Sequence, residues 1–220
     1  MNELACVPRI AVLASGSGTN LQSLLDATAC GTLEAKVTVV VSDRADAGAL
    51  RRAATAGVAT VSLPLADRRD PVVRQAYDRQ LALVTGAFEP DLIVLAGWML
   101  ILGPEFLDRF PERIVNVHPA LLPDDEGIEV LTSHGRLPVL RGPRPVRDAL
   151  RQRLPATGAT VHYVTNAVDC GPVILCEEVS ILPDDDELQL HERIKFVEHR
   201  LLPRAVAMAL AAVSTPNVVR

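Results

Sequence analysis

The sequence predicts an α/β fold, a doubly wound and mostly parallel sheet with helices on both faces. Short apolar runs alternate with segments whose apolar residues recur at helical spacing, which is typical of right-handed βαβ units. The run Leu92 to Ala96 is apolar throughout, as in a parallel strand buried on both faces. Two later runs, separated by a short polar stretch, predict a C-terminal antiparallel hairpin followed by a helix.

Each element has its own signal in the sequence. The expected strands are residues 9–14, 36–41, 58–63, 92–96 and 113–115, then the hairpin of 159–165 and 172–180. The expected helices follow residue 20 and cover 46–57, 70–86, a short stretch from 104, 146–153 and 187–213. Asp46, Asp70 and the acidic run 184–186 are expected caps, and Pro71 suits a first helical position. Pro119 to Pro145 shows little periodicity, which predicts a long loop.

Length and composition narrow the class of protein. A chain of 220 residues with 49% apolar residues fits one large domain, 1–220, and shows no second core. The net charge of −5 argues against a general nucleic-acid binder. The N-terminal stretch has no cationic region followed by an apolar run, and no segment is long enough to span a membrane. We therefore expect a cytoplasmic protein with neither nucleic-acid nor membrane partners.

The cysteines point away from metal and redox chemistry. None of Cys6, Cys30, Cys170 and Cys176 forms a C-x-x-C pair, so the sequence predicts no metal site. Scattered thiols in a chain of this size fit a reducing compartment.

A glycine-rich loop follows the first expected strand. Residues 15–20 read Ser-Gly-Ser-Gly-Thr-Asn and open a helix, so their backbone N–H groups and the helix dipole favour an anion. The third glycine of a dinucleotide fingerprint is replaced by Leu21. The loop fits a phosphate site for a mononucleotide, and a merely tight turn is the competing interpretation.

Asn116 and His118 follow the fifth expected strand and point to the same side of an extended segment. An amide donor beside an imidazole suits a reaction in which a carbonyl oxygen becomes negative and a proton moves. Asp169 precedes Cys-Gly-Pro and by itself fits a turn. Beside an imidazole, its carboxylate would favour the charged imidazolium.

Several motifs together resemble the phosphoribosylglycinamide formyltransferase family, folate-dependent enzymes of purine biosynthesis. The resemblance covers the chain from Arg9 to about Leu210 and is carried by six segments in the family's order. They are SGSGTNLQ (15–22), PDLIVLAGWM (90–99), IVNVHPALLP (114–123), VHYVT (161–165), VDCGPVI (168–174) and VEH (197–199).

The resemblance implies a formyltransferase-like Rossmann variant with a nucleotide-binding half, about 9–115, and a folate and catalytic half, about 116–213. It implies a catalytic trio of Asn116, His118 and Asp169, and substrate binding by Gly18, Thr19, Asn20 and Glu198. The implied folate-binding residues are Arg74, Met99, Leu100, Ile101, Leu102, Asn116, Thr165, Asn166, Ala167, Val168 and Asp169. Residues 99–102 could alternatively be core residues. Arg74 and Glu198 could alternatively be solvated surface residues.

The implied reaction is formyl transfer from 10-formyltetrahydrofolate to the amine of glycinamide ribonucleotide, without a metal. The expected partners are these small molecules, and the expected state is a monomer or homodimer.

Two departures from the family pattern affect the site. Ala120 stands where the family usually has serine, so one hydroxyl is missing. The segment 124–144 is longer than the family's and holds a single histidine, His134, where the family has a pair. Because this segment borders the substrate in the family, its replacement puts substrate-side contacts in question, though not the trio.

Three alternative functions remain open at the level of sequence. Formyltetrahydrofolate hydrolysis would use water as the nucleophile, but that family's regulatory domain has no counterpart before Arg9. A nicotinamide oxidoreductase would use residues 15–20 with Asp43 on a ribose, and would leave the trio without a role. A folate- or nucleotide-binding protein could have lost catalysis with the altered 124–144 segment.

Overall fold

The structure is a computed structural model that describes residues 7–214, so Cys6 lies outside the described residues. The strands of the main sheet are β1 (Arg9–Leu13), β2 (Lys36–Ser42), β3 (Ala59–Ser62), β4 (Leu92–Leu95), β5 (Ile114–His118), β8 (Ala156–Tyr163) and β9 (Val173–Ser180). A separate hairpin consists of β6 (Glu129–Thr132) and β7 (Gly135–Pro138). The helices are α1 (Thr19–Ala29), α2 (Gly48–Thr55), α3 (Pro71–Gly86), α4 (Pro104–Leu107), α5 (Pro145–Arg151) and α6 (Glu187–Ser214).

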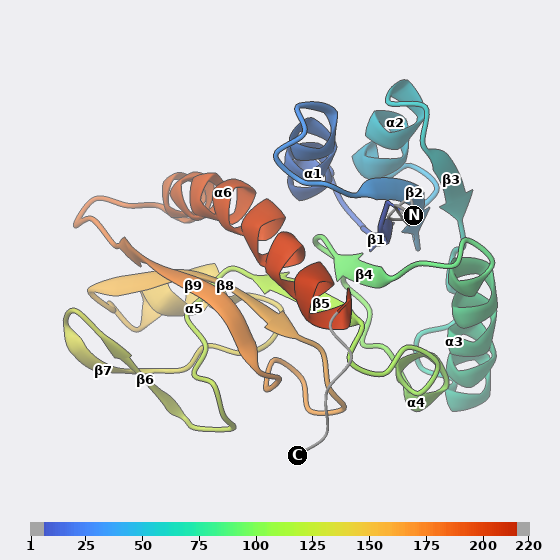
Figure 1. Ribbon diagram of the computed structural model, residues 1–220. Coiled ribbons are helices and arrows are strands. Elements are labelled where there is room, and N and C mark those ends of the chain that lie inside the picture. Colours follow the sequence, from blue (N-terminus) through green and yellow to red (C-terminus); the bar gives the residue numbers. More distant parts are fainter. Residues whose placement is uncertain (1–6, 215–220) are drawn as a thin grey trace, which may run out of the picture.

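The main sheet has seven strands in the order β3-β2-β1-β4-β5-β8-β9. The first five strands are parallel, and β8 and β9 are antiparallel additions beside β5. The order reverses between β1 and β4, and in open α/β sheets ligands bind at such a switch point. The predicted fold class is confirmed, including the C-terminal hairpin and helix (Figure 1).

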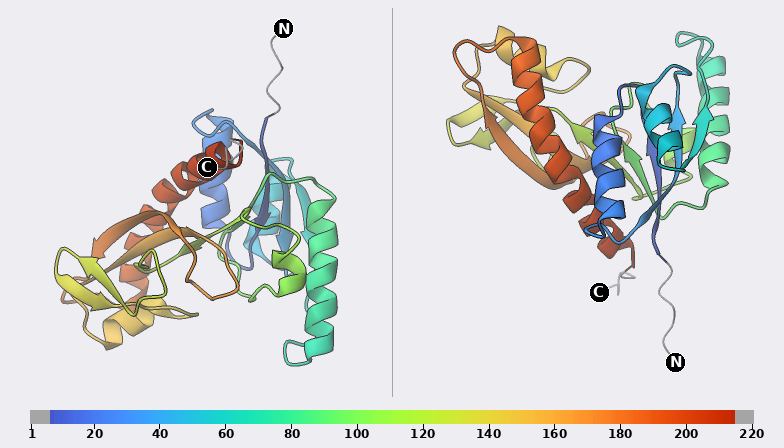
Figure 2. Two further views of the ribbon diagram at one scale, coloured as in Figure 1. Left: turned by 60° about the horizontal axis from the view of Figure 1, so that its bottom comes forward. Right: turned by 90° about the horizontal axis from the view of Figure 1, so that it is seen from above.

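Alternate residues of the parallel strands face two separate cores. Ile10, Val12 and Val94 belong to the core that packs against α1 and α6. Ala11 and Ile93 belong to the other core, which packs against α3 and α4. Figure 2 shows α3 on the face opposite α1 and α6. The continuous apolar runs of the sequence are thus explained by burial on both faces.

The expected helix caps give a mixed outcome. Asp70 accepts hydrogen bonds from the N–H groups of Val72 and Val73 at 2.8 and 3.3 Å, as expected for a cap before Pro71. Asp186 and Gln189 exchange reciprocal bonds at the start of α6, a capping box.

The predicted cap at Asp46 was wrong. The N-cap of α2 is Ala47, without a side-chain cap bond, and the Asp46 carboxylate accepts hydrogen bonds from the Arg44 guanidinium instead.

The fifth strand is longer than expected, because β5 continues through His118. His118 pairs with Thr160 and Asn116 with His162 on β8, so strand pairing extends the backbone beyond the apolar run. Asn116 and His118 therefore lie within a strand rather than after it.

The predicted loop of 119–145 was also wrong in part. Its middle forms the β6–β7 hairpin, which closes at Gly135 with φ +91° and projects from the main body (Figure 1). Neither strand is a continuous apolar run like Leu92–Leu95, and the glycines and prolines around them favour a loop.

Candidate active site

A cleft of about 670 Å³ opens at the carboxyl ends of β1, β4 and β5. The residues that line it come from the glycine loop, the run after β4, the end of β5, the β8–β9 loop and α6. They include Gly16 to Asn20, Leu95 to Leu102, Asn116 to Pro119, Gly142, Pro143, Pro145, His162, Val164 to Asn166, Val168, Asp169, His191, Lys195 and Glu198. The three polar clusters expected from the sequence thus share one cleft.

Helix α2 supports the glycine loop from behind. Gly18 has φ +77°, and a Cβ there would lie 2.6 Å from the Ala49 Cα. The Gly16 carbonyl accepts from the Ala49 N–H at 3.1 Å, and the Ser17 carbonyl accepts from Arg52 Nε at 2.9 Å. Packing and hydrogen bonds therefore fix the loop at the N-terminus of α1, where backbone N–H groups favour an anion.

Helix α6 presents a polar face to this loop. The Asn20 amide donates to Glu198 Oε2 at 3.0 Å, and Glu198 is only 3% exposed. Burial raises the pKa of the Glu198 carboxyl, against the lowering effect of the Asn20 bond. His191 and Lys195 also line the cleft, and their spacing with Glu198 places all three on one helix face. That spacing was the sequence signal by which His191 and Lys195 could have been found.

The Asp169 carboxylate lies between two imidazole rings. Its Oδ2 is 3.6 Å from His118 Nδ1, and its Oδ1 is 3.7 Å from His162 Nε2. Asp169 Oδ2 also accepts from the Gly142 N–H at 3.1 Å. The expected trio is therefore brought together, and His162 is added to it.

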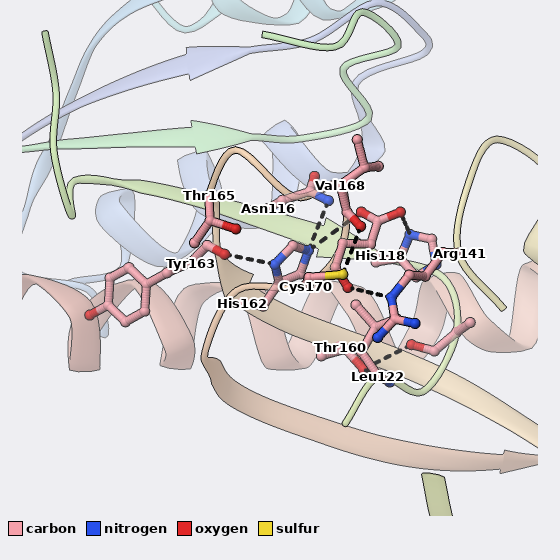
Figure 3. A network of polar contacts seen from close by, with 12 residues as sticks. Asn116, His118, Leu122, Arg141, Thr160, His162, Tyr163, Thr165, Val168 and Cys170 are labelled. Carbon is pink, nitrogen blue, oxygen red and sulfur yellow. Dashed lines mark hydrogen bonds and ion pairs between the residues drawn. The ribbon is translucent and has the colours of Figure 1, made fainter. Parts of the chain in front are cut away.

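His162 fixes the orientation of Asn116 (Figure 3). Its Nδ1 lies 2.8 Å from the Tyr163 carbonyl oxygen, which only accepts, so Nδ1 is the donor. Its Nε2 then accepts from Asn116 Nδ2 at 3.2 Å. Burial lowers the pKa of His162, against the raising effects of the Tyr163 bond and the Asp169 charge, which keeps the neutral ring available as an acceptor. Sequence analysis missed this residue, because only the β5–β8 register places it opposite Asn116.

The run after β4 forms an apolar wall. Leu100 and Leu102 are buried in the core, whereas Met99 and Ile101 are 57% and 66% exposed. All four line the cleft. Core packing is thus correct for two residues of this run, and all four lie at the cleft.

Of the remaining residues expected to bind folate, some line the cleft and others do not. Arg74 donates to the Ile101 carbonyl oxygen and lies 4.0 Å from Asp78, but it is not among the residues that line the cleft. Ala167 does not line the cleft either, whereas Thr165, Asn166 and Val168 do.

The two departures from the family pattern have different consequences. Ala120 is buried in a small apolar cluster with Leu140 and Ala149, and it does not line the cleft. The 124–144 segment does reach the site, because the Leu140 carbonyl accepts from His118 Nε2 at 2.8 Å. His134 lies on the exposed hairpin, 3.3 Å from Glu178, and not in the cleft.

Among residues 7–214, no three His, Cys, Asp or Glu side chains are grouped to hold a metal ion. No helix in this part of the chain is long and apolar enough to cross a membrane.

The fold and the site define a class of protein. The family model described as formyl transferase matches residues 8–206, and the chain belongs to this family. Membership implies a folate cosubstrate.

Individual relatives carry the name of one enzyme within this family. The chain is 46% identical over 199 residues to a phosphoribosylglycinamide formyltransferase of Mycobacterium tuberculosis, covering 90% of this chain and 83% of the relative. It is 37% identical over 198 residues to the enzyme of the same name from Escherichia coli, covering 90% and 85%. The solved structure of glycinamide ribonucleotide transformylase 1 from Symbiobacterium toebii superposes with a TM-score of 0.82 at 39% identity, covering 94% of this chain and 89% of that one.

Proposed function

We propose that this protein transfers the formyl group of 10-formyltetrahydrofolate to the amine of glycinamide ribonucleotide. The observation that carries the proposal is the meeting of Asn116, His118 and Asp169 in one cleft, between a phosphate-type loop and an apolar wall. The relatives that bear the name of this activity match the chain over 90% of its length. The expected setting is cytoplasmic, with small molecules as partners and a monomer or homodimer as the working form.

The reaction needs a group that stabilises negative charge on the formyl oxygen. The substrate amine attacks the formyl carbon, and a tetrahedral intermediate with an oxyanion forms. One N–H of the Asn116 amide is used by His162, which leaves the second N–H for the oxyanion. Because His162 holds the amide before substrate binds, this donor needs no reorganisation during the reaction.

A proton must also move from the attacking amine to the departing folate nitrogen. His118 Nε2 is engaged by the Leu140 carbonyl, so Nδ1, beside Asp169, is the nitrogen left for a proton in transit. The Asp169 carboxylate lies 3.6 Å from that nitrogen, and a proton that passes through the ring there would bring positive charge to the developing oxyanion.

The two substrates are assigned to opposite ends of the cleft. Gly18, Thr19 and Asn20 would hold the phosphate of the ribonucleotide, and Glu198 a hydroxyl or amine of it. Asn20 Oδ1 is buried and, among the described residues, has no hydrogen-bond partner, which suits a donor from the ligand.

The folate would lie at the other end of the cleft. Met99 to Leu102 and Thr165 to Asp169 would surround its pterin. Arg74 would act on the folate side through the Ile101 backbone that it holds.

The direct test is to incubate purified protein with glycinamide ribonucleotide and 10-formyltetrahydrofolate and to follow the folate absorbance. The proposal expects a formylated ribonucleotide, identified by mass spectrometry, and loss of turnover in His118→Ala. Folate turnover at the same rate without ribonucleotide would indicate a hydrolase. Binding of both ligands without single-turnover product would indicate a binding protein. Full activity in His118→Ala would refute the mechanism.

A further inference from the structure

Three consecutive residues after the β6–β7 hairpin contact the catalytic groups. The Leu140 carbonyl accepts from His118 Nε2 at 2.8 Å, and the Gly142 N–H donates to Asp169 Oδ2 at 3.1 Å. Between them, Arg141 Nε donates to the backbone oxygen of Asp169 at 3.1 Å (Figure 3). We call residues 140–142 the clamp.

Arg141 joins the clamp to two loops. Besides the Asp169 oxygen, its guanidinium donates to the Asp125 carbonyl at 3.3 Å. Asp169 itself has φ +53°, a left-handed conformation that carries a steric cost for a residue with a Cβ. A charged donor on its carbonyl offsets part of that cost, because charge-assisted hydrogen bonds are about twice as strong as neutral ones. Arg141 thereby holds the Asp169 backbone in the orientation that directs its carboxylate between the two rings.

The hairpin anchors the clamp away from the cleft. Its base closes through the Val139 N–H and the Ile128 carbonyl at 2.9 Å. Its tip is tied to β9, because Glu178 Oε2 accepts from the Ser133 N–H at 2.9 Å. The segment 124–144 thus forms a braced support whose end reaches His118 and Asp169.

We propose that Arg141 is a positioning residue for formyl transfer, acting through Asp169 without touching substrate. Its side chain does not line the cleft, whereas both groups that its neighbours hold do. The expected effect of Arg141 on kcat rests on the proposed function. Its effect on the position of Asp169 does not depend on the substrate.

The kinetic test compares Arg141→Ala and Arg141→Lys with Arg136→Ala. Arg136 is the matched control, an arginine of the same segment whose ion pair among the described residues is with the exposed Glu129, at 3.9 Å. Arg141→Ala should lower kcat by about 10–100-fold, the effect of a displacement of about 1 Å at a reacting group, with KM for the ribonucleotide nearly unchanged. Arg141→Lys keeps the charge but not the planar guanidinium, so its kcat should lie between those of the parent and Arg141→Ala. Added guanidinium should partly restore the kcat of Arg141→Ala.

A second measurement does not need turnover. The NMR signals of the His118 and His162 rings should move in Arg141→Ala in the direction seen in Asp169→Asn, and should stay in place in Arg136→Ala. If the parent protein showed no turnover, the proposed function would be refuted. The NMR signals of the two rings would still test whether Arg141 positions Asp169. The positioning role is overturned if Arg141→Ala leaves the ring signals unmoved, or if it only lowers Tm while kcat per folded molecule equals that of Arg136→Ala.

Discussion

Asp169 is the residue that connects the two imidazoles of the site. Its two carboxylate oxygens face His118 and His162 at nearly equal distances, 3.6 and 3.7 Å. The two rings have different partners. Burial lowers the pKa of His162, and its Nε2 accepts from the Asn116 amide. His118 Nε2 instead donates to the Leu140 carbonyl.

Asp169→Asn should lower kcat by about 10²–10³-fold with little change in KM, because the shape is kept and the charge is lost. The Gly142 N–H can still donate to the amide oxygen, so the fold should persist. Steady-state kinetics measure the effect. Combined with His118→Ala, the change should cost little more than His118→Ala alone, and full additivity would show that the two groups act independently.

Glu198→Gln should stabilise the protein while weakening its binding of the ribonucleotide. A carboxyl with a raised pKa holds its proton more tightly in the folded state, so the charged form opposes folding at high pH. The amide avoids that cost and can still accept from Asn20. Tm should rise at pH 8, well above the ordinary pKa of 4.5 for this group.

The gain from Glu198→Gln should shrink as pH falls and vanish below the ordinary value of 4.5, where both states are protonated. Scanning calorimetry of the parent and the variant across this range measures it. If Glu198→Gln raised Tm by the same amount at every pH, the buried charge of Glu198 could not be the cause of the stabilisation.

At the scale of elements, the glycine loop depends on α2 as much as on its own residues. A Cβ at Gly18 would lie 2.6 Å from the Ala49 Cα, whereas one at Gly16 would meet nothing within 4 Å. The two glycines therefore differ in what they can tolerate, although they are two positions apart.

Gly18→Ala should destabilise the protein by about 1–3 kcal/mol, since it combines a left-handed φ with a backbone clash. Denaturant unfolding measures this loss. Gly16→Ala is the control for stability and should unfold within about 0.5 kcal/mol of the parent. Equal stability of the two variants would mean that α2 shifts freely and does not fix the loop.

At the scale of the whole molecule, the cleft extends from the carboxyl ends of the parallel strands β1, β4 and β5 to the antiparallel strand β8. Its walls come from both halves of the chain, with the glycine loop and the apolar wall before Ile114 and the trio after it. A ligand that fills the cleft must therefore contact segments distant in sequence.

An antifolate should slow hydrogen exchange of the backbone amides in 99–102 and in 165–169 together. Glycinamide ribonucleotide should instead protect 16–20. The edge strand β3 serves as the control, since Ala59–Ser62 lies at the far end of the sheet and does not line the cleft. Mass-resolved exchange measures all three regions. Protection confined to the glycine loop and Asp43 would support the dinucleotide alternative.

The sequence by itself determined the fold class and singled out the positions Asn116, His118 and Asp169. Strands such as Leu92–Leu95 are continuous apolar runs because both their faces are buried, and that burial is visible as composition. Asn116, His118 and Asp169 could be singled out because each stands next to a local signal, a strand end or a glycine turn.

Only the tertiary structure decided the partners of those residues. His162 meets Asn116 through the register of β5 and β8, and Arg141 meets Asp169 through the return of a hairpin that looked like a loop. Both contacts join residues far apart in the chain, at 46 and 28 positions. No local propensity encodes such a distance, because it is set by how strands pair and where the chain folds back.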